Sequence, residues 1–334
     1  MTVGGPRTWT YRRRMPRARK QLVCADETPY YHVSSRCVRR AFLCGVDHYS
    51  GRSYEHRRVW IEQRARVLAS VFSIELCAYA VMSNNYHLVL NLTPDEATEW
   101  SDDEVLKRWT VLYRGTLLVQ RYCDGESLLE VELQALRSTA AVYRRRLADL
   151  SWFMKCLNEP IARRANREDS CTGHFWESRF YSQALRSERA LLAAMAYVDL
   201  NPVRAGMTER PEDAEFTSLA ARLRGKDADE RLDASFNEAL SAGEYLHDRL
   251  SLRSLMPFSD AWRNRGNSSL PIREGEYVKL VDMTGRVATR GKRGSVDPTL
   301  APVLERLKIS ADDWIEASSD FRRSYRRGDL KHSA

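Results

Sequence analysis

Two apolar runs separated by a short polar segment constrain the fold of this chain more than any other feature. The first run extends from Ile74 to Met82 and the second from Tyr86 to Leu92, with Ser83-Asn84-Asn85 between them. Both runs are apolar and contain β-branched residues, and the separation is short. This pattern predicts a β-hairpin.

The second strand of this hairpin carries polar side chains on one face. Because alternate residues of a strand share a face, Asn85, His87 and Val89 should point one way, and Tyr86, Leu88 and Leu90 the other. Two ligand-type side chains at i and i+2 can reach one divalent ion. The alternative is that His87 is an ordinary hydrogen-bonded histidine on a sheet face.

A helix is predicted to begin at Ser187-Glu188, where Ser187 is a good N-cap residue. Its packing face would consist of Leu191, Leu192, Met195 and Val198. Pro202 should end it, because the residue before a proline is pushed out of the helical region.

One stripe of this helix holds Ala193, Tyr197 and Asn201, which follow one another at intervals of four residues. The small alanine should leave Tyr197 within reach of a bulky substrate. Tyr197 can equally be read as a core residue of an amphipathic helix, with Asn201 as its polar terminator.

Residues 51–71 and most of 101–165 also carry helical patterns.

The chain is basic, with a formal net charge of +8. Its arginines and lysines gather in three regions, around residues 12–40, 286–293 and 322–331. Such charge favours a polyanionic partner, although any single cluster is compatible with a merely solvated surface.

The seven cysteines are scattered and form no CxxC pair, so the sequence indicates neither a zinc knuckle nor a disulfide framework. No apolar run reaches membrane-spanning length, and no signal peptide follows the basic start. We expect a cytoplasmic, nucleoid-associated protein with no membrane role. Met15 is a candidate for the true start.

Four segments together resemble a known family. Ser83-Asn84-Asn85-Tyr86-His87-Leu88-Val89-Leu90 resembles the His-hydrophobic-His (HUH) strand of the single-tyrosine, single-strand DNA transposases. Residues 173–180 (GHFWESRF) resemble the aromatic segment before their nucleophile helix. Residues 197–206 (YVDLNPVRAG) resemble that helix in the REP-associated tyrosine transposases, and residues 28–37 fit the family's first strand.

The resemblance implies an α+β fold, with a ferredoxin-like antiparallel sheet flanked by helices. We expect a disordered basic leader over residues 1–14 and the HUH transposase-like domain over 15–220. Residues 221–334 would form a mostly helical basic extension that also contacts DNA.

The resemblance also implies a site. Tyr197 would be the nucleophile, and His87 and Asn201 would be ligands of a Mg²⁺ or Mn²⁺ ion. The function implied is a DNA transposase and endonuclease that cleaves and rejoins single-stranded DNA at REP-like hairpins through a 5′-phosphotyrosine. Single-stranded or hairpin DNA would be the partner, and the site would be completed within one chain or across a homodimer.

Asn85 departs from the family pattern, because a histidine is expected at this position. Its amide oxygen is a neutral, hard ligand that suits Mg²⁺, but it lacks the imidazole nitrogen that softer ions favour. Three interpretations stay open: a working site of weaker metal affinity, an impaired transposase that still binds nucleic acid in a structure-specific way, or an error in the sequence.

The remaining candidates concern DNA contacts. Arginines that track phosphates and aromatic rings that stack on unpaired bases are the usual means of binding single strands. The candidates are Arg204, Arg36, Arg39, Arg40 and Trp176.

Overall fold

Four antiparallel strands form the central sheet of the computed structural model, in the order β2-β3-β1-β4. The structure describes residues 28–38, 43–47, 51–225, 230, 234, 252–259 and 269–290, the last five by backbone alone. The leader over residues 1–14 and most of the two C-terminal basic regions lie outside these ranges.

The strands are β1 (Tyr30–Arg36), β2 (Ile74–Val81), β3 (Asn85–Leu92) and β4 (Tyr181–Ala184). The helices of the first half are α1 (His56–Val71), α2 (Pro94–Glu99), α3 (Asp102–Thr110), α4 (Leu117–Cys123), α5 (Glu130–Leu147) and α6 (Leu150–Glu168). Those that follow are α7 (Glu188–Asp199), α8 (Asn201–Arg204), α9 (Ser218–Arg224) and α11 (Glu274–Arg290).

The order of elements follows the ferredoxin-like β-α-β-β-α-β pattern. β2 and β3 form the predicted hairpin, and β1 pairs antiparallel with β3 on one side and β4 on the other. The predicted α+β fold, an antiparallel sheet flanked by helices, is therefore confirmed. Among the described residues, no helix has both the length and the apolar character needed to cross a membrane.

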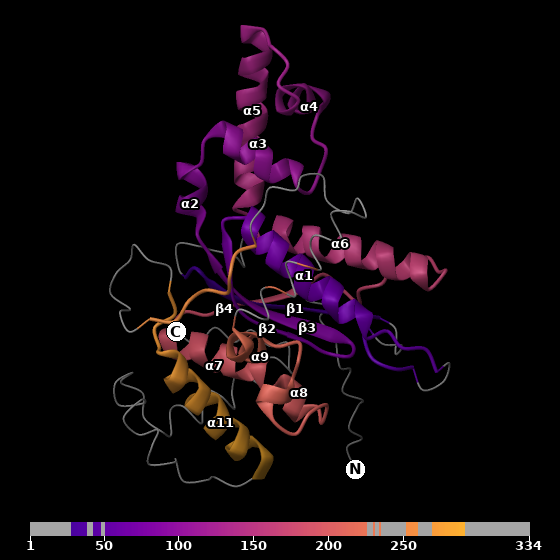
Figure 1. Ribbon diagram of the computed structural model, residues 1–334, viewed down its shortest axis with the longest axis vertical. Helices are drawn as coiled ribbons and strands as arrows, with labels where there is room; N and C mark the ends of the chain where they lie inside the picture. The colour runs from indigo at the N-terminus through magenta and orange to yellow at the C-terminus, as the bar shows by residue number, and fades with distance from the viewer. Residues whose placement is uncertain are drawn as a thin grey trace, which may run out of the picture.

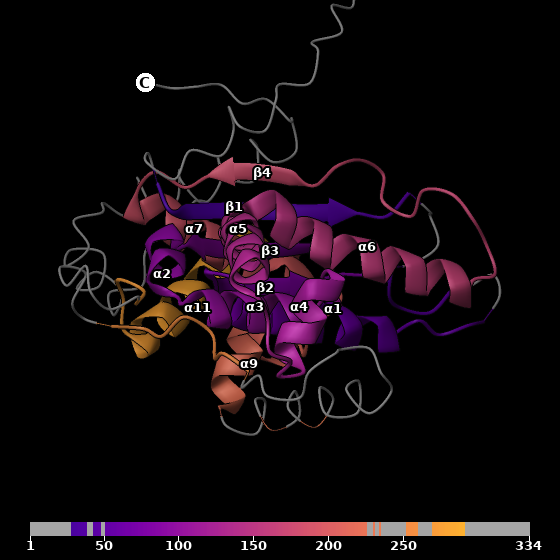
Figure 2. The same cartoon turned by 90° about the horizontal axis from the view of Figure 1, so that it is seen from above.

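Each face of the sheet is covered by different helices, and the strand alternation decides which residues each face receives. Tyr86, Leu88 and Leu90 join the core beneath α1 and α6, whereas Val89 joins the core beneath α7. Figures 1 and 2 show α1 and α6 on one side of the sheet and α7 with α11 on the other. The predicted assignment of the β3 side chains to two faces is confirmed.

Between β3 and α6, helices α2 to α5 form an insertion that extends away from the sheet (Figure 1). An aromatic stack links α3 to α5, because the rings of Trp109 and Tyr143 lie 4.2 Å apart and nearly parallel. The predicted helical character of residues 101–165 is confirmed.

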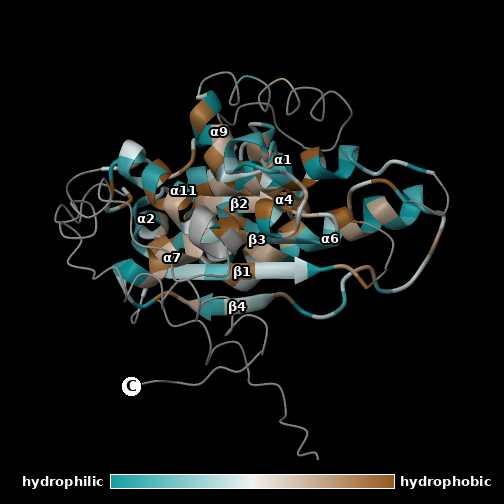
Figure 3. Cartoon of the chain, turned by 90° about the horizontal axis from the view of Figure 1, so that it is seen from below, coloured by the Kyte–Doolittle hydropathy of each residue, from teal (hydrophilic) through white to brown (hydrophobic). Residues whose placement is uncertain are grey.

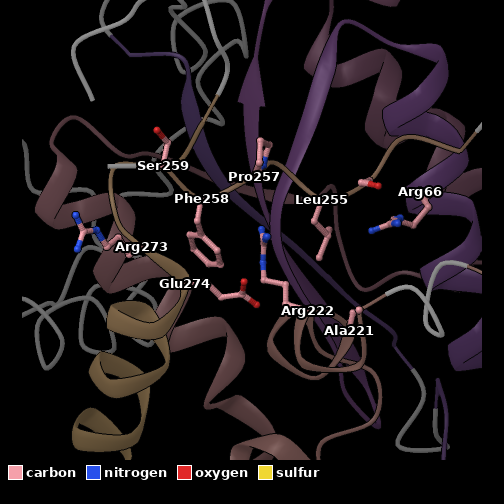
Figure 4. A pocket seen from close by; sticks show the side chains of 11 residues that line it. Arg66, Ala221, Arg222, Leu255, Pro257, Phe258, Ser259, Arg273 and Glu274 are labelled. Atoms are coloured by element: carbon pink, nitrogen blue, oxygen red, sulfur yellow. The ribbon is translucent and has the colours of Figure 1, made fainter. Parts of the chain in front are cut away.

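The outer edge of β2 is covered by later parts of the chain, which protects an otherwise unpaired strand edge. Met256 donates its backbone N–H to the Leu76 carbonyl, and Val81 donates to that of Phe216. Arg222 donates to the carbonyls of Cys77 and Met256, each at 2.9 Å. A cavity of about 550 Å³ opens beside this edge, and Figure 4 shows Arg222 and Phe258 among its lining residues.

The helix α7 begins and ends close to the predicted positions. The side chain of Ser187 accepts a hydrogen bond from the Ala190 N–H, as expected of an N-cap. The helix ends at Asp199, ahead of Pro202, and a further helical turn, α8, then contains that proline. The four residues of the predicted packing face are buried.

Helix α11 continues through Gly285 to Arg290, although a glycine by itself favours a turn. A side chain at Gly285 would have little room, since its Cβ would lie 3.1 Å from the Leu200 side chain. The glycine therefore permits close packing of α11 against the end of α7 instead of bending the chain.

A buried carboxylate ties α7, α9 and α11 together. Asp199 accepts hydrogen bonds from the hydroxyl of Ser218 (2.6 Å), the N–H of Leu219 (2.9 Å) and the phenol of Tyr277 (2.5 Å). Burial raises the pKa of Asp199 above its ordinary value, while these three donors oppose the shift. Buried polar groups of this kind hold elements in one relative position when all are satisfied.

We predict that Tyr277→Phe lowers the free energy of unfolding by about 1–3 kcal/mol, because the Asp199 carboxylate loses a buried donor. Urea unfolding measures this change. Tyr143→Phe is the matched control, because Tyr143 is also buried, and its role is to stack on Trp109. Equal stability changes in the two variants would contradict a structural role for the Tyr277–Asp199 bond.

Candidate active site

Two histidines from neighbouring strands lie side by side on the sheet face that α7 covers. The β1–β3 register places Ser34 opposite His87, so His32 on β1 is the diagonal neighbour of His87 on β3. The rings are stacked, with centroids 5.2 Å apart and planes inclined by 7°. His32 Nε2 and His87 Nδ1 are 3.0 Å apart, at hydrogen-bonding distance.

Asn85 completes a row of three polar side chains. Its amide Nδ2 lies 2.7 Å from His87 Nε2, so both ring nitrogens of His87 have hydrogen-bond partners. If the amide donates to Nε2, then Nδ1 carries the proton and donates to His32. The residue in the expected histidine position therefore contacts His87 directly.

Tyr197 meets this histidine pair edge-on. Its ring centroid lies 5.8 Å from that of His87 and 6.2 Å from that of His32, at interplanar angles of 84° and 82°. The guanidinium carbon of Arg204 lies 5.4 Å from the Tyr197 ring centroid, within the range of a cation–π contact. Residues more than a hundred positions apart in the sequence thus form one cluster.

Tyr197 is less accessible than the helix stripe predicts. Only 6% of its surface is exposed, and Ala193 below it is almost fully buried. The reason is tertiary: the sheet face, α11 and the segment around Met256 and Leu270 surround α7 as one hydrophobic core. Tyr197 is therefore largely enclosed by this core.

A second tyrosine borders the same histidines. Tyr181 on β4 lies opposite Ser34, and its ring centroid is 6.2 Å from that of His32. It is half-buried and therefore easier to reach than Tyr197. Its hydroxyl donates to Gln183 at 3.3 Å.

Sequence reasoning missed His32 and Tyr181 as members of the site. His32 lies in the segment that predicts the first strand, but a strand pattern does not reveal its neighbours. Only the antiparallel register with β3 places it beside His87. The available signal was the alternation of polar and apolar residues along this strand, in which His32 is one of the polar residues.

Burial keeps both histidines neutral. It lowers the pKa of His87 from its ordinary value to about 3. Burial also lowers the pKa of His32 well below that value, and repulsion from a charged His87 adds to the effect. Near neutral pH the rings therefore act as hydrogen-bonding groups without charge.

The Asn85 amide and the His87 ring lie at a spacing that fits two ligands of one hard divalent ion. In an octahedral Mg²⁺ site adjacent ligand atoms lie roughly 3 Å apart, close to the 2.7 Å between the Asn85 amide and His87 Nε2. The Asn85 amide would have to present its oxygen, which a rotation of the side chain provides. The set of Asn85, His87 and Asn201 contains no carboxylate.

Asn201 lies on α8, one turn beyond Tyr197, as the sequence suggests. Its amide Nδ2 is buried, with no hydrogen-bond partner among the described residues. Unpaired buried polar atoms are uncommon, and a ligand is one explanation for them. In the part of the chain that the structure describes, no three His, Cys, Asp or Glu side chains gather closely enough to hold a metal.

The residues predicted to contact DNA differ in how accessible they are. Arg36, at the end of β1, is exposed and lies 3.9 Å from the Glu177 carboxylate. Trp176 is half-buried, donates its indole N–H to the Asn158 carbonyl and packs edge-on against Tyr86. Arg39 and Arg40 lie outside the described residues.

No family model matches this sequence, and no curated protein matches it. Among solved structures, the chain is similar to a REP-associated tyrosine transposase bound to a REP hairpin. The sequences are 11% identical, the TM-score is 0.29, and the match covers 70% of this chain and 92% of that chain. At this TM-score the similarity carries no argument about the family of this chain.

The buried histidine pair predicts a pH-dependent stability. Because the folded-state pKa values lie below the unfolded value near 6.5, the unfolded chain binds more protons as the pH falls. Each histidine should therefore cost about 1 kcal/mol of stability between pH 7 and pH 5.5. Urea unfolding at both values, with a chelator present, measures the change.

His87→Gln should remove about half of this histidine-linked loss, because one of the two buried imidazoles is gone. An identical pH dependence in wild type and variant would show that His87 is not held neutral in the folded protein.

Proposed function

We propose that this protein cuts and rejoins single-stranded DNA next to hairpins, with Tyr197 as the nucleophile. The observation that carries the proposal is the packing of Tyr197 edge-on against His32 and His87. Two of the segments that resemble a tyrosine transposase, residues 83–90 and 197–206, are separated by the whole α2–α6 region. Their side chains nevertheless meet at one point on the sheet.

The chemistry follows from a phenol placed against a phosphodiester. The Tyr197 oxygen attacks phosphorus, forming a P–O bond to the tyrosine and breaking the bond to the 3′ oxygen. The phenol loses its proton to solvent, and the leaving oxygen gains one to become a 3′-hydroxyl. Attack by a 3′-hydroxyl on the phosphotyrosine reverses these changes and joins strands without a separate energy source.

A Mg²⁺ or Mn²⁺ ion would polarise the scissile phosphate and offset the charge that develops on it. Asn85, His87 and Asn201 would hold the ion. Since these ligands are neutral, the DNA phosphate would supply the compensating negative charge. His32 would position His87 through the Nε2–Nδ1 contact, in the manner of a residue that orients a metal ligand.

Arg204, which lies over the Tyr197 ring, supports the same proposal. A guanidinium within 5.4 Å of the ring favours negative charge on the attacking oxygen and on the phosphate. The proposal includes action in the cytoplasm, in association with the nucleoid. It also includes completion of the site either within one chain or in a homodimer.

A second candidate is a structure-specific nucleic-acid-binding protein without catalysis. Two observations favour it: both nitrogens of His87 are hydrogen-bonded, and Tyr197 is buried. In that case the hydrogen bonds from Asn85 to His87 and from His87 to His32 would have only a structural role. The two candidates differ in whether a covalent bond to DNA forms.

Incubation with hairpin-bearing single-stranded DNA and Mn²⁺ distinguishes them, with products separated on a denaturing gel. The proposal predicts a protein–DNA adduct in the wild type and its loss in Tyr197→Phe. Tyr181→Phe is the matched control, because Tyr181 borders the same histidines and should not carry the bond.

An adduct that survives Tyr197→Phe but disappears in Tyr181→Phe would move the nucleophile to β4. Tight DNA binding without any adduct would favour the second candidate.

Asn85→His should strengthen Mn²⁺ binding by about tenfold, because an imidazole nitrogen replaces an amide oxygen. A Mn²⁺ titration of the protein alone, followed by electron paramagnetic resonance, measures this affinity independently of activity. Asn84→His places the same ring one residue earlier, in the turn, and should leave the affinity unchanged. Equal affinities in all three proteins would show that position 85 is not beside the ion.

A further inference from the structure

A cavity of about 640 Å³, here termed the α6 cavity, lies between α6 and the segment over residues 173–180 that leads into β4. Pockets that hold small organic groups usually measure roughly 300–1,000 Å³. Ala162 lines the α6 cavity from the helix, and Phe175, Trp176 and Phe180 line it from the segment. Its wall is therefore largely apolar and aromatic.

Contacts with neighbouring elements hold the aromatic wall in place. The Trp176 indole N–H donates to the Asn158 carbonyl at 2.9 Å. Its ring also meets the rings of Phe175 and Tyr86 edge-on. The Phe175 carbonyl accepts a hydrogen bond from the N–H of Val38 at 2.9 Å. Rings that are fixed before a ligand arrives lose little conformational freedom on binding.

Two cations stand at the rim of the α6 cavity. Lys155 belongs to α6, with its Nζ 4.6 Å from the centroid of the Trp152 ring, and Arg179 belongs to the segment before β4. Both side chains are exposed, and neither forms an ion pair within the part of the chain that the structure describes. Their charges are available to an anion outside the cavity.

The two carboxylates that line the α6 cavity have cationic partners of their own. Glu159 forms an ion pair with Arg163 on the next turn of α6. Glu177 lies 3.9 Å from the guanidinium of Arg36. These acids are therefore neutralised by arginines that do not line the cavity, and Lys155 and Arg179 leave the rim positive.

The α6 cavity and the tyrosine site meet at the β4 edge of the sheet. Figures 2 and 3 show β4 outside β1, and no described strand lies beyond it. Phe180 lines the cavity, and the next residue, Tyr181, borders His32. Arg36, which reaches the cavity wall at Glu177, lies opposite Asn85 in the β1–β3 register. A single strand at the tyrosine site thus has a short route around this edge.

We propose that the α6 cavity receives one unpaired base from the single-stranded flank of the DNA on which Tyr197 acts. The base would lie against the aromatic wall, with its neighbouring phosphates at Lys155 and Arg179. An aromatic wall with cations at its rim suits a nucleotide, which joins a flat π-face to a negative charge. The inference rests on the proposed function for the identity of the DNA and adds a site that requires an unpaired base.

The test uses the full chain carrying Tyr197→Phe, with a chelator present, so that binding is measured without cleavage. Fluorescence anisotropy would follow a labelled hairpin with a single-stranded flank and the same hairpin without the flank. A further series replaces each flank base in turn by an abasic residue. Ala162→Phe fills the cavity from α6, and Ala141→Phe is the matched control, because Ala141 is exposed on α5 and does not line the cavity.

One abasic position should weaken binding by about tenfold, as the loss of one base–aromatic contact does. Ala162→Phe should weaken binding of the flanked hairpin by a similar factor and abolish the effect of that abasic position. It should leave binding of the bare hairpin unchanged, because a paired base cannot enter the cavity without leaving the helix. Ala141→Phe should bind like the parent protein.

Arg179→Ala tests the rim without altering the cavity wall. Loss of one phosphate contact should lower the slope of log K against log salt by about one on the flanked hairpin. Arg145→Ala removes another exposed arginine, from α5, and should leave the slope unchanged.

The proposal is overturned by an abasic series without a sensitive position, by equal binding of the Ala162 and Ala141 variants, or by equal losses on the flanked and bare hairpins. Absence of DNA binding by the parent protein would also overturn it. Failure of the proposed function gives a separate result, namely that wild type with Mn²⁺ forms no adduct. The binding comparison needs neither metal nor cleavage, so it distinguishes the two failures.

Discussion

The pairing of β1 with β3 determines where the polar side chains of the sheet lie in the candidate site. With Ser34 opposite His87, the alternating side chains of both strands place His32, Asn85 and His87 on one face. A slip of one residue would turn these groups into the core that holds Tyr86, Leu88 and Leu90. Both faces of the sheet are covered by helices. Such a slip would therefore place the wrong side chains in the core on each face.

The position of the phenol depends on a second constraint, the docking of α7. This helix contributes Tyr197 to the site and Asp199 to a buried hydrogen-bond group with α9 and α11. The two residues are only two positions apart, so the contacts of Asp199 limit how α7 can rotate. The C-terminal helix α11 therefore influences the site although it supplies none of its polar groups.

Local patterns predicted the elements well and their long-range contacts less well. The β2–β3 hairpin, the Ser187 cap and the two faces of β3 follow from residues close in sequence, where turn chemistry and alternation act directly. His32 and Tyr181 could not be placed, because their proximity to His87 depends on strand register across more than fifty residues.

The burial of Tyr197 and the helix through Gly285 have the same kind of cause. A small alanine on the same helix stripe leaves Tyr197 accessible only if no other element packs against that stripe. In this protein α11 and neighbouring segments pack there. Glycine favours a turn by itself, but the contact with Leu200 makes a missing side chain useful inside a helix. In both cases tertiary packing outweighed the local preference.

In the proposed reaction, the phenol oxygen of Tyr197 forms a covalent bond to a phosphorus atom of the DNA. The most direct test is mass spectrometry of the tryptic peptides after reaction with hairpin-bearing single-stranded DNA. If Tyr197 is the nucleophile, the nucleotide mass is added to the peptide over residues 190–204, which contains Tyr197. Addition to residues 180–186, which contain Tyr181, or to no tyrosine at all, would contradict it.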